Sequence, residues 1–117
     1  MAMVMLSMTS AFAGNENELN ITPVADAKAY DMSLNYNSLA RLLDLNIEQA
    51  DEIENIHDRF CYDMSKAAKA TNAAERKALV EKAVTRDLRN MHYVLSDNQF
   101  NKYRSVLNTT FINRGLK

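Results

Sequence analysis

Glycine, proline and cysteine are scarce in this chain of 117 residues, which has two glycines, one proline and one cysteine. So little glycine excludes the glycine-rich loops that cradle phosphate groups, and the sequence has no nucleophile elbow. Neither sign of charge is in excess, because 14 basic residues face 15 acidic ones. We therefore expect no catalytic residue and no cofactor, and the charge balance favours neither nucleic acid nor an anionic membrane as a partner.

The uncharged N-terminal run is too short to span a bilayer. It reads MAMVMLSMTSAFA over residues 1–13 and ends in the small-x-small pattern Ala11-Phe12-Ala13, followed by Gly14. This pattern is typical of a secretory signal peptide and its cleavage site, although the basic residues that usually begin one are missing. We predict a signal peptide over 1–13 and an exported protein, periplasmic or secreted, without a membrane anchor. A buried N-terminal helix is the alternative.

The single cysteine, Cys61, cannot form an intramolecular disulfide. In an oxidising compartment such a residue is buried, pairs with another chain or stays free. Cys61 lies at the edge of an apolar stripe of helical period, which favours burial as a small apolar side chain. Stability must then come from packing.

Two parts of the chain differ in their periodicity. Residues 14–32 include the only proline, Pro23, and have no sustained apolar period, so we expect a mobile leader there. Residues 33–117 are expected to form a single helical domain. Steps of three and four between apolar residues predict a short helix from Leu34 to Asp44 and longer helices over Ile47 to Ala70, Ala73 to Val94 and Asp97 to Ile112.

Two similar pentapeptides mark helix starts: LNIEQ at 45–49 and LSDNQ at 95–99. Each has an apolar residue, a cap residue and a glutamine three positions after the cap, which is the pattern of a capping box preceded by an apolar staple. These residues are Leu45, Asn46 and Gln49 in the first copy and Leu95, Ser96 and Gln99 in the second. Asn72 and Glu75 have the same spacing and predict a third start.

Each long helix has one apolar stripe. The stripes are Ile53, Ile56, Phe60, Met64 and Ala67; Val80, Val84, Leu88, Met91 and Leu95; and Phe100, Tyr103, Leu107 and Phe111. Helices with one apolar face and short connections pack as antiparallel neighbours. We therefore predict an all-α fold, either an antiparallel helical hairpin or a small open bundle of about four helices.

Charge is distributed unevenly between the first two long helices. Acidic residues gather in the N-terminal half of the first, and Arg86 and Arg89 lie in the C-terminal half of the second. Antiparallel packing would bring the two clusters together; the alternative is two solvated faces that do not meet.

One pair of residues suits a metal. His57 and Cys61 are four positions apart on one helix face, with Glu54 one turn back and His92 on the next helix. The alternative is packing of both side chains, with the imidazole half exposed. We assign no metal, and His57 and Cys61 are the only candidate ligands we retain.

The pentapeptides give the chain a family resemblance. It resembles the LTxxQ family of small helical periplasmic proteins, the Spy/CpxP-like proteins, over roughly Leu45 to Leu107. Both copies match the Leu and the Gln of the motif, and Asn46 and Ser96 stand where the family has Thr. The resemblance implies an antiparallel hairpin, usually a dimer with a concave face, that holds unfolding envelope proteins without ATP or assists a stress pathway.

Three functions remain open at this stage. The first is an ATP-independent chaperone or envelope-stress protein that binds unfolded or partner proteins in the envelope, with Arg86 and Arg89 at the rim of the contact surface. The homodimer is what the resemblance implies, and the sequence leaves the oligomeric state open. The second is a metal-binding sensor or scavenger, since metal-responsive relatives share the fold. The third is a structural helical protein that binds a partner and has neither of these activities.

Overall fold

The computed structural model describes residues 20–117, which contain helices and no strand. The elements are a 3-10 helix, η2 (Ala27–Tyr30), and four α-helices: α1 (Tyr36–Leu43), α2 (Ile47–Ala68), α3 (Ala73–Val94) and α4 (Asp97–Asn113). The predicted all-α fold with about four helices is confirmed. The predicted signal peptide at 1–13, and the leader as far as residue 19, lie outside the described residues.

The helices begin where the sequence predicts. Asn46, Asn72 and Ser96 are the N-caps of the three long helices, and each side chain accepts a hydrogen bond from the backbone N–H three residues on. Full capping boxes, with the glutamine side chain bonded back to the cap N–H, form at α2 and α4. After α4 the chain turns at Gly115, whose φ of 77° is in the left-handed region that glycine adopts without strain.

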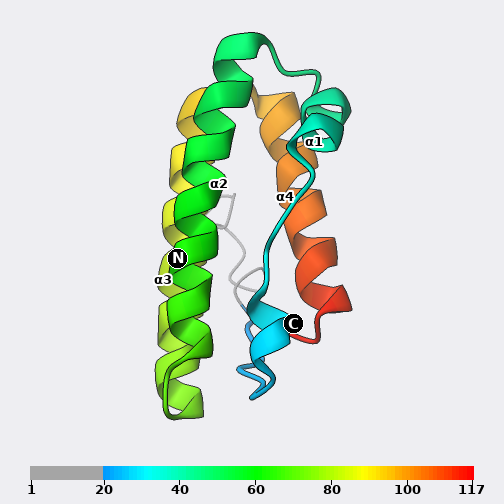
Figure 1. Ribbon diagram of the computed structural model, residues 1–117. Coiled ribbons are helices and arrows are strands. Elements are labelled where there is room, and N and C mark those ends of the chain that lie inside the picture. The colour runs from blue at the N-terminus through cyan, green and yellow to red at the C-terminus, as the bar shows by residue number, and fades with distance from the viewer. Residues whose placement is uncertain (1–19) are drawn as a thin grey trace, which may run out of the picture.

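The long helices run antiparallel in chain order (Figure 1). α2 and α3 pack along one another, α4 returns beside them, and α1 lies at the end of the bundle where α2 and α4 begin. Every residue of the three predicted stripes is buried except Ile56, which is partly buried. The stripes therefore form one continuous core between the helices.

The part of the expected leader that the structure describes is packed. We call residues 21–33 the N-terminal strap. Four strap side chains, Ile21, Ala29, Tyr30 and Met32, are at most 7% exposed and belong to the core. In Figure 1 the strap carries η2 and then rises as extended chain between α2 and α4 to reach α1. The packed domain therefore begins before residue 33, where the sequence analysis places its start. The sequence does not indicate this, because the apolar residues of the strap have no helical period.

None of the helices within residues 20–117 is both long enough and apolar enough to cross a membrane.

Candidate functional site

The two pentapeptides meet in space through their glutamines. Gln49 Nε2 donates to Gln99 Oε1 at 2.9 Å, and Gln99 Nε2 lies 3.3 Å from Gln49 Oε1. Each Oε1 also accepts from the backbone N–H of its own cap residue, Asn46 at 3.1 Å and Ser96 at 2.9 Å. Each capping glutamine is thus also a partner of the other, 50 residues away.

The remaining amide donors reach the ends of the preceding helices. Gln49 Nε2 donates to the carbonyl of Val94 at 3.1 Å, at the end of α3. Gln99 Nε2 lies 3.1 Å from the carbonyl of Leu43 and 3.2 Å from that of Asp44, at the end of α1. The carbonyls at a helix end have no partner within their own helix, so this arrangement satisfies several at once. The α1–α2 and α3–α4 turns are therefore cross-linked by two side chains.

Apolar side chains are exposed around this end of the bundle. Leu42 is 52% exposed, Ile47 82% and Tyr93 83%, and they come from the last turn of α1, the first of α2 and the last of α3. The paired glutamines join these same turns. Exposed apolar side chains at one end of a bundle suit contact with another polypeptide.

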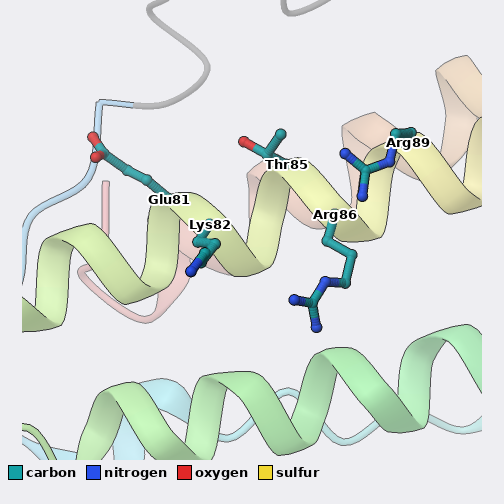
Figure 2. Close-up of a pocket in the computed structure, with 5 residues that line it drawn as sticks. All are labelled: Glu81, Lys82, Thr85, Arg86 and Arg89. Atoms are coloured by element: carbon teal, nitrogen blue, oxygen red, sulfur yellow. The ribbon is translucent and has the colours of Figure 1, made fainter.

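A basic groove lies along α3 and ends one turn before Tyr93. Its volume is about 340 Å³, and its lining residues are Glu81, Lys82, Thr85, Arg86 and Arg89. Figure 2 shows Lys82 and Arg86 pointing from α3 towards α2, while Arg89 lies further along α3. Arg89 and Tyr93 are four residues apart on the helix and share a face. The sequence-predicted rim residues, Arg86 and Arg89, therefore lie on a path that leads to an exposed aromatic ring.

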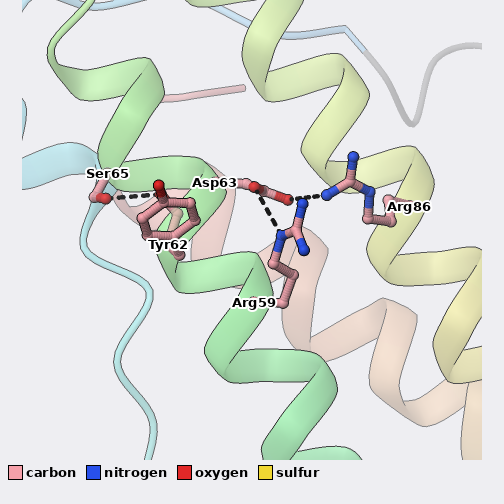
Figure 3. Close-up of polar contacts among 5 residues, drawn as sticks. All are labelled: Arg59, Tyr62, Asp63, Ser65 and Arg86. Atoms are coloured by element: carbon pink, nitrogen blue, oxygen red, sulfur yellow. Dashed lines mark hydrogen bonds and ion pairs between the residues drawn. The ribbon is translucent and has the colours of Figure 1, made fainter.

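One carboxylate neutralises part of this groove. Asp63 on α2 accepts from Arg86 at 3.0 Å and from Arg59 at 3.2 Å (Figure 3). Within residues 20–117, Lys82 and Arg89 take part in no ion pair. The groove therefore keeps a positive charge, and Arg86 has a structural role that Arg89 lacks.

The acidic and basic clusters stay largely apart. The acids in the N-terminal half of α2, Glu48, Asp51, Glu52 and Glu54, are all exposed. Among the described residues, only the Asp63–Arg86 pair bridges α2 and α3 by charge. Of the two sequence alternatives, solvated faces describe the molecule better than merged clusters.

The two candidate metal ligands are positioned for packing. His57 is 2% exposed, and its Nε2 lies 2.6 Å from the Met32 carbonyl of the strap, so Nε2 must carry the proton. Burial lowers the pKa of His57, which keeps the ring neutral. The half-exposed imidazole considered as an alternative is wrong because the strap covers this ring.

Cys61 and His92 complete no ligand set with His57. Cys61 is half-buried, and burial raises the pKa of its thiol to about 11. His92 stacks on Phe100 and lies 3.7 Å from Asp97 of α4. Among residues 20–117, no three potential ligands gather at one point.

A polar pair that the sequence analysis missed lies in the core. Tyr103 on α4 donates a hydrogen bond to Asp87 Oδ2 on α3, and Asp87 is 2% exposed. Its Oδ1 has no hydrogen-bond partner among the described residues. Burial raises the pKa of Asp87 to about 7, and the Tyr103 hydrogen bond opposes part of that rise. The spacing gave a signal, because Asp87 falls between Val84 and Met91 on the apolar face of α3.

Comparison with protein family models, with curated proteins and with solved structures found no match to this chain.

Proposed function

We propose that this is an exported binding protein without catalytic activity, which acts as an ATP-independent chaperone or an envelope-stress accessory protein for unfolded clients. The observation that carries the proposal is the reciprocal pairing of Gln49 and Gln99. The resemblance to the LTxxQ family rests on these two pentapeptides, and their pairing makes them parts of one structural unit that supports the end of the bundle.

The client surface in this proposal combines apolar and basic groups. Leu42, Ile47 and Tyr93 supply exposed apolar area at the end that the glutamines join, and Arg89 leads to it along α3. Unfolded segments expose apolar side chains, which such a surface binds without a covalent or ATP-driven step. A few exposed apolar residues bind a client only weakly. Weak binding suits a protein that must release its clients without ATP.

The test is a light-scattering assay with several unrelated clients that aggregate on heating. Near-stoichiometric amounts of the protein should delay aggregation in the absence of nucleotide. Changing Ile47 and Tyr93 together to Ser should weaken the effect, because it removes apolar contact area. Unaltered aggregation curves for all clients would rule out the chaperone role.

The charge contribution has a matched control in the same chain. Lys82→Glu with Arg89→Glu reverses two charges in the groove and leaves the Asp63–Arg86 pair intact. Lys77→Glu with Lys102→Glu makes the same change in net charge at two exposed positions outside the groove. The groove variant should delay aggregation less than the control variant. Arg86→Glu is less suitable, because it also places two carboxylates side by side.

Export is tested separately by mass spectrometry of the protein recovered from the producing cell. The proposal requires a mature chain that begins at Gly14. A recovered chain that retains Met1 would contradict export by signal-peptide cleavage.

A further inference from the structure

The N-terminal strap lies between α2 and α4, which make little contact with one another. We call the place that the strap fills the strap groove; it is distinct from the basic groove on α3. α2 packs closely on α3 and on η2, whereas α4 approaches α3 and α1 and makes little direct backbone contact with α2. The strap lies between α2 and α4 in Figure 1. Its most buried side chains, Tyr30 at 2% and Met32 at 3% exposure, complete the core at this place. Without the strap, the apolar faces of α2 and α4 would lie open to water.

The contacts that anchor the strap are made to its backbone. Thr22 N–H donates to the Leu116 carbonyl at 2.6 Å, and His57 Nε2 lies 2.6 Å from the Met32 carbonyl. Arg114 also donates to the carbonyl of Asp31. Two of these bonds use a strap carbonyl, which every residue has, and one uses an N–H, which every residue except proline has. These three bonds therefore do not depend on the side-chain sequence of the strap.

The side chains that enter the strap groove need only be apolar and suitably spaced. Tyr30 and Met32 are buried, while Asp31 and Ser33 between and beside them are exposed. Tyr30 ends η2, and from Asp31 onwards the chain is extended, so the exposure of Asp31 and Ser33 around the buried Met32 is that of an extended segment with one face on an apolar surface. Peptide-binding grooves combine main-chain bonds with apolar pockets for alternate side chains in the same way.

The strap is separate from the four α-helices of the bundle. The described chain joins it to α1 through residues 34–35. The main body of the fold, the α2–α3 hairpin, has its own packing and caps. Segments held by a few contacts open more readily than packed helices.

We propose that the strap groove between α2 and α4 is a binding site for an extended apolar segment of an unfolded polypeptide, and that the strap is a built-in occupant which the client displaces. The identity of the ligand rests on the proposed function; the exchange of the strap does not. Competition from the strap lowers the apparent affinity for clients, because only the open fraction of the protein binds them. The strap thereby protects the core when no client is present.

The first experiment measures exchange of the strap directly. The probe is a fluorescent peptide with the sequence of residues 20–35, NITPVADAKAYDMSLN. The protein with Tyr30→Ser and Met32→Ser has a weakened strap and should bind this peptide about tenfold more tightly than the wild type. The control, Ala25→Ser with Lys28→Ser, alters two exposed strap positions and should behave as the wild type. Fluorescence anisotropy reports each affinity.

The second arm adds a permanently unfolded protein, reduced and carboxymethylated so that it cannot refold. It should displace the labelled peptide from the weakened-strap variant. If the peptide binds and the unfolded protein leaves it in place, the strap groove is not a client site. If the wild type delays aggregation but the peptide binds neither protein, the inference about the strap groove fails and the proposed function stands. A dimer that the peptide dissociates would make a second copy of this chain the occupant and would also overturn the proposal.

Hydrogen exchange on the unaltered protein gives a test that does not depend on the variant folding. With the unfolded protein at saturation, amides of residues 21–33 should exchange faster, while those of the α2–α3 hairpin keep their protection. A strap that stays equally protected while the client is bound would contradict displacement.

Discussion

Gln49 and Gln99 donate hydrogen bonds to one another across 50 positions of sequence, and each also caps its own helix. A capping glutamine normally acts only within its own turn. Here the pair joins the start of α2 to the start of α4 and, through the amide donors, to the carbonyl ends of α3 and α1. The pentapeptide is therefore a unit of tertiary structure that works as two copies.

The pairing of the two side chains requires the amide donors of glutamine, whereas a simple capping box accepts glutamate or glutamine equally well. Gln99→Glu keeps an oxygen for the Ser96 N–H but loses both donors and places a charge near the carbonyls of Leu43 and Asp44. We expect a loss of about 1 to 3 kcal/mol in the free energy of unfolding. The control is Glu75→Gln at the equivalent position of α3, which should change it little. Equal denaturant midpoints for the two variants would show that the pairing contributes no stability.

The N-caps themselves give a second prediction. Asn46→Ala and Ser96→Ala each remove the acceptor for a backbone N–H at a helix start, at 2.7 Å and 3.2 Å. Each should lower the free energy of unfolding by about 1 kcal/mol, as measured by urea denaturation. Because the two caps belong to one hydrogen-bond network, the loss of unfolding free energy in the double variant should differ from the sum of the losses in the two single variants. Unchanged midpoints in both single variants would contradict the capping role.

What the sequence revealed about the fold was mostly local. Caps and stripes depend on residues three or four apart, and the structure has helix starts at Asn46, Asn72 and Ser96 as predicted. The pairing of Gln49 with Gln99 depends on how α2 and α4 meet, which no local pattern specifies. The repetition of the pentapeptide was the only signal of it.

The strap and the buried Asp87 were missed for different reasons. Ile21, Tyr30 and Met32 are spaced irregularly, so neither a helical nor a strand period marks them as core. Asp87 lies between the basic residues Arg86 and Arg89 in sequence, although its spacing from Val84 places it on the apolar face. A charged residue at a position of an apolar stripe indicates a buried ionisable group. Its position in the stripe is then better evidence of burial than its residue type, because charged residues are rarely buried.

The thiol of Cys61 is expected to react slowly. It packs against the core and burial raises its pKa to about 11, so little thiolate is present at pH 8. Labelling of the native protein by a thiol reagent should be much slower than that of the protein unfolded in urea, and no disulfide should be needed for stability. Equal labelling rates, or a covalent dimer lost on reduction, would contradict this.

The stability of the protein should depend on pH through Asp87. Its pKa is about 7 in the folded state against an ordinary value of 3.8, so between these values the unfolded chain is ionised while the folded protein keeps the proton. Unfolding then releases a proton, and the free energy of unfolding falls as pH rises, by up to about 1.4 kcal/mol per pH unit. Above pH 7 both states are ionised and this contribution becomes flat.

Asp87→Asn tests this directly, because asparagine resembles the protonated carboxyl and cannot ionise. The variant should have a stability close to that of the wild type at pH 4 and clearly higher at pH 8, since the wild type then holds an unpaired charge in the core. Asp51→Asn makes the same chemical change at an exposed position and should keep the pH profile of the wild type. Tyr103→Phe removes the hydrogen bond that lowers the pKa of Asp87. The free energy of unfolding of this variant should therefore continue to fall to a higher pH than that of the wild type. Urea denaturation at several pH values measures all four proteins, and a wild-type profile that stays level between pH 4 and 7 would show that Asp87 does not titrate in this range.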